Sequence, residues 1–177
     1  MSSVIVAGDV SGSVTLQAPS ASGTTVITLP TTTGTMMVNG PAFSAYSSAA
    51  QSIATVTWTK VQFNVEVFDT NSNYDPTTNY RFTPTVAGYY QVNATLSMNN
   101  GATTAYCNLS IYKNGVENKT ISYGNYQGLS GCIANLVQMN GTTDYIEIYI
   151  FNAEATNRSI LGSSPATGFS ASMVRSA

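Results

Sequence analysis

The chain has 177 residues, of which only 8% are charged, against about 25% in a typical soluble domain. It contains no histidine, which excludes Ser-His-Asp and Cys-His catalytic relays and imidazole metal sites. Six cations and a formal net charge of −2 argue against a surface for nucleic acid, and no apolar run reaches the roughly 20 residues that span a bilayer. We therefore expect no enzyme, no nucleic-acid partner, no cofactor and no membrane insertion.

The remaining composition favours strands over helices. Ser, Thr and Asn occupy 61 of the 177 positions, good helix formers are scarce, and Thr, Val, Ile and Tyr are plentiful. The sequence thus predicts an all-β protein. No Lys or Arg precedes the first apolar residues, so we expect no secretory signal and assembly in the cytoplasm of the producing cell.

Residues 1–40 form the first predicted unit. Two short β-like runs, Val14–Leu16 and Val26–Leu29, lie among Ser, Thr, Gly and Pro. So few apolar residues cannot close a core, and a lone two-stranded ribbon is marginal in water. We therefore expect an arm that lies on a partner, with the following anchoring residues: Val14, Leu16, Val26, Ile27 and Leu29.

Residues 41–177 form the second predicted unit, in which apolar and polar residues alternate. Such alternation places one buried face on each strand, as in antiparallel sandwiches. The predicted buried faces are Val61, Phe63, Val65 and Val67; Tyr90, Val92, Ala94, Leu96 and Met98; Cys107, Leu109 and Ile111; and Ile146, Ile148 and Ile150.

Turn residues separate these strands. Asn114-Gly115 and Asn140-Gly141 carry the strongest short hairpin signal, because both central residues of a type I′ turn need a positive φ. The many short strands and turns together predict a β-sandwich or jelly roll.

The second unit also resembles a known family. Residues 74–90 (YDPTTNYRFTPTVAGYY) resemble the signature of the globular heads of complement component one, subcomponent q, whose jelly roll is shared with tumour necrosis factor. Three further motifs follow in the family's order: 109–115 (LSIYKNG), 139–148 (MNGTTDYIEI) and 168–174 (GFSASMV). The resemblance implies a jelly-roll β-sandwich that assembles as a homotrimer.

The sequence departs from that family in two places. The usual Gly-Asp before the penultimate strands is lengthened to Gly141-Thr142-Thr143-Asp144, and no collagen-like stalk is present. In place of a stalk, residues 12–35 resemble a short module of tailed-phage fibre and virion proteins. Together the two resemblances imply a structural protein of a phage virion.

Two groups of polar residues are candidates for a calcium site and for a catalytic site. The spacing Asp69-x-Asn71-x-Asn73-x-Asp75 imitates the start of an EF-hand loop, but Tyr74 and Tyr80 replace the required Gly and Glu, so we favour an Asn-rich turn over a calcium site. Glu147 and Glu154 could form a glycosidase pair, but we expect solvated or interface positions for both.

The cysteines, Asp144 and one aromatic strand face give three more expectations. Cys107 and Cys132 could pair, although the phase of Cys107 with Leu109 and Ile111 favours a buried free thiol. Asp144 is expected in a turn. Because the isoleucines of their strand already face a core, we expect part of the other face to contact neighbouring subunits, namely Tyr145, Tyr149 and Phe151.

These observations predict a non-enzymatic, trimeric capsid decoration (cement) protein that the arm anchors to the major capsid protein or another virion protein. The short arm favours this function over a fibre, which needs a long shaft. The alternative is a tail- or head-fibre tip, a receptor-binding adhesin that contacts a host-surface glycan by stacking sugar rings on loop residues such as Tyr74, Tyr123 and Tyr126.

Overall fold

The computed structural model describes residues 3–7, 10–17, 20–21, 23–24, 40–99, 106–123 and 130–177. All regular structure in these residues is β-strand, as predicted. The chain divides into two compact units, Met1–Thr35 and Met36–Ala177, called here the arm and the body.

The arm contains one antiparallel hairpin, formed by β1 (Ser3–Ala7) and β2 (Ser13–Gln17). Val14 and Leu16 lie in β2, where a strand was predicted. The sequence analysis missed β1, because the run of Val4, Ile5 and Val6 is continuous rather than alternating. The predicted run Val26–Leu29, with Val26, Ile27 and Leu29, lies outside the described residues.

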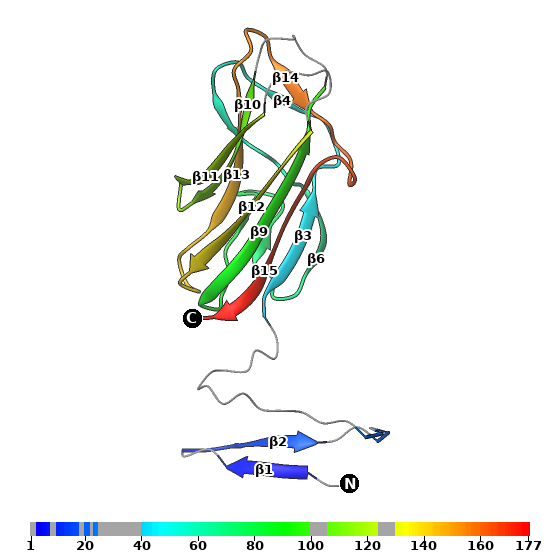
Figure 1. Ribbon diagram of the computed structural model, residues 1–177, viewed down its shortest axis with the longest axis vertical. Coiled ribbons are helices and arrows are strands. Elements are labelled where there is room, and N and C mark those ends of the chain that lie inside the picture. The colour runs from blue at the N-terminus through cyan, green and yellow to red at the C-terminus, as the bar shows by residue number, and fades with distance from the viewer. Residues whose placement is uncertain are drawn as a thin grey trace. The chain divides into compact units, whose positions relative to one another are not determined.

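The body is a sandwich of two antiparallel sheets (Figure 1). One sheet has six strands in the order β11-β10-β13-β8-β7, with β5 also paired to β13. Its strands are β5 (Trp58–Lys60), β7 (Tyr74–Asp75), β8 (Arg81–Phe82), β10 (Cys107–Lys113), β11 (Val116–Tyr123) and β13 (Ile146–Asn152).

The other sheet has five strands in the order β12-β9-β15-β3-β6. Most neighbours in both sheets are distant in sequence, as expected of a jelly roll. The five strands are β3 (Ala42–Tyr46), β6 (Val65–Asp69), β9 (Gly88–Ser97), β12 (Ser130–Met139) and β15 (Gly168–Ser176). A short two-stranded sheet, β4 (Gln51–Ile53) with β14 (Arg158–Ile160), completes the body.

The core lies between the two sheets. Phe43 is its aromatic centre and stacks on Tyr74 and Phe82, with ring centroids 4.6 Å apart in both pairs. Phe169 meets Phe43 edge-on at 4.8 Å. The predicted faces of β9, β10 and β13 are all buried here, which confirms their alternation.

The predicted alternation over Val61–Val67 is wrong in its second half. Val61 and Phe63 are buried, and the Val61 N–H donates to the Ile148 carbonyl of the six-stranded sheet. The chain then crosses to the five-stranded sheet, where β6 pairs with β3 through a bulge and Val67 is 60% exposed. The alternation is therefore interrupted where the segment changes sheets.

The two Asn-Gly signals have different outcomes. Asn114 and Gly115 join β10 to β11 with φ values of 54° and 76°, as a type I′ hairpin requires. Asn140 and Gly141 instead connect β12 to β13, which belong to different sheets, so the second predicted hairpin is wrong. There the Asn140 Oδ1 accepts three backbone N–H groups and closes an Asx turn.

Candidate functional site

The outer face of the five-stranded sheet is almost uncharged over four of its five strands, whereas the edge strand β6 carries Glu66 and Asp69. Arg175 is the single charged residue of the four strands β12, β9, β15 and β3. In register, the face presents rows of neutral and mostly small side chains: Ala42, Ser172, Gln91 and Leu136; Ser44, Ser170, Asn93 and Ala134; and Tyr46, Gly168, Thr95 and Cys132.

This face is hollowed where its side chains are smallest. A shallow hollow of about 110 Å³ lies over Gly168, lined by Ser44, Asn93, Thr95 and Ser170 among others. A second depression of about 400 Å³ lies beside Cys132, Pro165 and Ala166. Neutral small groups let another protein surface approach without removing water from a charge, so the face is suited to close protein contact.

The outer face of the six-stranded sheet carries an aromatic–ionic cluster, which comprises Trp58, Lys60, Tyr112, Glu147, Tyr149 and Phe151. Its ring centroids are 5.5 Å apart for Trp58 and Phe151, and 4.3 Å apart for Tyr112 and Tyr149. Lys60 Nζ lies 2.6 Å from Glu147 Oε1 and 5.9 Å from the centre of the Tyr149 ring.

Burial raises the pKa of Tyr149 to about 12, and the Glu147 carboxylate adds to this effect. Burial also raises the pKa of Tyr112. Both phenols are therefore neutral near pH 7, and the charges of Lys60 and Glu147 compensate each other. The aromatic–ionic cluster is largely satisfied by contacts within its own chain.

The three residues of the predicted subunit interface lie on this same face. Tyr149 and Phe151 belong to the aromatic–ionic cluster, and Arg81 Cζ lies 4.5 Å from the centre of the Tyr145 ring. All three side chains are partly covered by their own chain, and their role between subunits stays a prediction. The sequence did not point to Trp58 and Tyr112, because it does not show which strands pair or in what register they pair.

Glu147 and Glu154, the candidate glycosidase pair, are both buried, contrary to the solvated or interface positions expected for them. Glu147 is 4% exposed and bound to Lys60, while Glu154 is 5% exposed and bound to Arg158. Arg158 also donates to the Asn99 carbonyl. Each carboxylate therefore has a cation as its partner. Lys60 is distant from Glu147 in the sequence, so spacing could not reveal that pair, whereas Arg158 lies only four residues after Glu154.

The Asp69–Asp75 loop uses its carboxylates to cap backbone N–H groups, as the Asn-rich-turn interpretation predicts. Asp69 accepts from the Asn71 and Tyr74 N–H groups at 3.2 and 2.6 Å. N–H groups of Thr78 and Thr77 hold the pKa of Asp75 well below its usual range. Among the described residues, no group of three or more Asp, Glu or Cys side chains is placed to hold a metal ion.

Asp144 lies in the turn where it was expected. Burial alone would raise its pKa, but hydrogen bonds from Lys113, the Asn114 amide and the Asn140 N–H outweigh burial and lower it. Lys113 Nζ lies 2.9 Å from Asp144 Oδ2, and Asn114 Nδ2 lies 2.7 Å from Oδ1. Asp144 thus ties the β10–β11 turn to the connection between the sheets.

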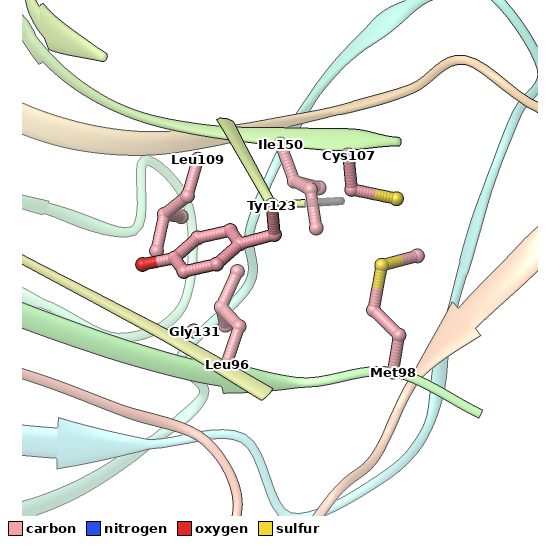
Figure 2. Close-up of a pocket in the computed structure, with 7 residues that line it drawn as sticks. All are labelled: Leu96, Met98, Cys107, Leu109, Tyr123, Gly131 and Ile150. Carbon is pink, nitrogen blue, oxygen red and sulfur yellow. The ribbon is translucent and has the colours of Figure 1, made fainter. Parts of the chain in front are cut away.

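Both cysteines are free thiols, which confirms the favoured alternative for Cys107. Cys107 is buried, and burial raises its pKa, whereas Cys132 is exposed. Figure 2 shows Cys107 and Met98 in a small cavity between the sheets, with the Tyr123 ring beside Leu96 and Leu109. Its volume of about 10 Å³ and its apolar lining leave no room for a ligand.

The structure places the three predicted sugar-stacking tyrosines differently. Tyr74 is only 6% exposed and donates its hydroxyl to the Phe63 carbonyl, so stacking by Tyr74 is wrong. Its position in the aromatic core, stacked on Phe43, explains this burial. Tyr123 is half-buried and donates to the Cys132 carbonyl, and Tyr126 lies outside the described residues.

No family model matches the sequence, and no curated protein matches it. Solved structures do share its fold. The globular domain of zebrafish complement 1qA matches with a TM-score of 0.60 and 17% identity, over 78% of this chain and 100% of that chain. Murine APRIL matches with a TM-score of 0.57 and 13% identity, over 77% of this chain and 100% of that chain.

A third structure, the PRD1 vertex protein P5, matches with a TM-score of 0.56 and 16% identity, over 76% of this chain and 97% of that chain. At these identities the matches establish the fold alone, which is the predicted jelly roll. None of the described residues forms a helix long and apolar enough to cross a membrane.

Proposed function

We propose that the protein is a non-enzymatic structural component of a phage virion, a homotrimeric decoration protein that its arm anchors to the shell. One observation carries the assembly part of this proposal: four adjacent strands of the body carry a single charge, Arg175. A face with almost no charge loses little solvation when it meets another protein surface.

We assign the trimer contact to the outer face of the five-stranded sheet. Its central row of Ser44, Ser170 and Asn93 has only short side chains, which permit close approach of a second copy. The aromatic–ionic cluster on the other sheet fits a contact less well, because the partly exposed Lys60 would have to lose water. The complement 1qA and APRIL relatives, trimeric-type jelly rolls, support a homotrimer.

The virion part of the proposal is supported by the fold of the PRD1 vertex protein P5 and by the arm. The described part of the arm exposes Ile5 and Val10, and exposed apolar side chains of this kind mark a surface that contacts another protein. A decoration protein acts by adding buried area at subunit seams, which raises the temperature at which the shell opens.

Electron cryo-microscopy of the virion tests the proposal. We expect threefold jelly-roll density on the head, with hundreds of copies per particle. A protein lacking residues 1–40 should fold and trimerise but fail to join the particle. Few copies at a tail or fibre tip would support the adhesin alternative, and absence from the particle would contradict a virion role.

A further inference from the structure

The hairpin of the arm has one wholly apolar face. Its register pairs Val4 with Leu16 and Val6 with Val14 directly across the two strands. Directly opposed residues point to the same side of a sheet, and so do residues two apart, so all four side chains share one face. They are 54–64% exposed, so the hairpin itself does not cover them.

The opposite face of the hairpin is mixed rather than apolar. Ile5 pairs there with Thr15, and Ala7 pairs with Ser13. Neither strand contains a charged residue or a proline, the groups with which proteins protect exposed strands from pairing. An isolated two-stranded hairpin is marginally stable, so this one needs further apolar contact to persist.

We propose that the hairpins of three sister chains pack against one another through the Val4, Val6, Val14 and Leu16 face and form an apolar stem. This inference rests on the homotrimer of the proposed function. An uncharged apolar face is complementary to itself, because identical copies bring no like charges together. A partner surface with charges would fit less well, because its charges would be buried without partners.

The tether between the hairpin and the body favours sister copies over any other occupant. In a homotrimer, each hairpin is joined to its own body by one stretch of chain, and a chain spans at most about 3.6 Å per residue. The three hairpins of one trimer therefore cannot move far from one another. Such tethering gives an effective concentration on the order of millimolar. Val14 and Leu16, expected from the sequence to contact the particle, are thereby assigned to contacts between arms.

Cross-linking of the purified full-length protein tests this assignment. Val6→Cys places a thiol on the apolar face, and Thr15→Cys places one on the opposite face of the same hairpin. Both variants carry Cys132→Ser, which removes the exposed native thiol and leaves Cys107 buried. With a short bismaleimide, we expect at least tenfold more covalent dimer from Val6→Cys than from Thr15→Cys.

Elastase digestion gives a second measurement that does not depend on cysteine chemistry. Val6→Asp with Val14→Asp should expose the arm and speed its cleavage about tenfold, whereas Ile5→Asp with Thr15→Asp should leave the rate nearly unchanged. Equal cross-linking and equal cleavage rates in a protein of trimeric mass would overturn the stem and leave the proposed function standing. A monomeric mass for the unmodified protein would instead contradict the homotrimer itself.

Discussion

The two outer faces of the body differ in how their polar groups are satisfied. On the six-stranded sheet, Lys60 binds Glu147, and the tyrosine rings pack on one another within the chain. On the five-stranded sheet, the rows around Ser170 offer neutral groups and two shallow hollows. The aromatic rings already have partners within their own chain, so we place the proposed contact on the neutral face, and the role of the aromatic face between subunits stays a prediction.

The largest expected effect is that of a charge in the middle of the neutral face. Ser170→Arg would bury a cation without a partner in the trimer and weaken association by about 3 kcal/mol, roughly a hundredfold in the dissociation constant. Light scattering should then give a monomeric mass with unchanged circular dichroism. Ser122→Arg, at an exposed position of β11, is the matched control and should stay trimeric. Equal behaviour of the two variants would refute the assigned face.

Tyr149→Ala tests the interface predicted from the sequence. If the aromatic–ionic cluster serves its own subunit, removing this half-buried ring should lower the free energy of unfolding by about 2 kcal/mol and leave the trimer intact. Urea denaturation and light scattering measure the two quantities separately. Dissociation into stable monomers would instead support an interface through Tyr145, Tyr149 and Phe151.

Lys60→Met should have a smaller effect on the same face. The substitution leaves the buried Glu147 without its cation, but Lys60 is partly exposed, so we expect a loss of about 1 kcal/mol. Adding Glu147→Gln should recover part of the loss, because the unpaired charge is then removed. A double variant that is less stable than Lys60→Met alone would show that Glu147 is held by other groups.

The smallest expected effect is the pH dependence contributed by Asp144. Its folded pKa is lowered, so its stabilisation is complete above the ordinary carboxyl pKa of about 3.9 and is lost as the pH falls through the folded value. Between pH 7 and pH 3, the melting temperature of the unmodified protein should therefore fall further than that of Asp144→Asn. Parallel pH profiles would exclude this contribution.

Local patterns predicted the strands well and the partners of single side chains poorly. Alternation located the buried faces of β9, β10 and β13, because each strand keeps one face on the core throughout. It failed at Val67, where the chain changes sheets, because contacts distant in sequence decide which sheet a segment joins. Glu154 was expected in a solvated or interface position and is instead buried against Arg158, four residues further along the chain, a pairing that strand alternation does not address.

The same limit applies to the candidate surfaces. Tyr145, Tyr149 and Phe151 were placed on one face by their spacing, but the cover from Trp58 and Tyr112 needs the pairing of three strands. The neutral face was visible in the sequence only as low total charge. Its location became clear once β12, β9, β15 and β3 were found side by side.

A crystal structure of the full-length protein in its solution assembly would test the central claim most directly. We predict three copies around a threefold axis, with β12, β9, β15 and β3 facing the neighbouring subunits and the aromatic–ionic cluster facing outward. A trimer that buries Tyr149 and Phe151 at its axis, or a monomer with the five-stranded sheet open to solvent, would contradict it.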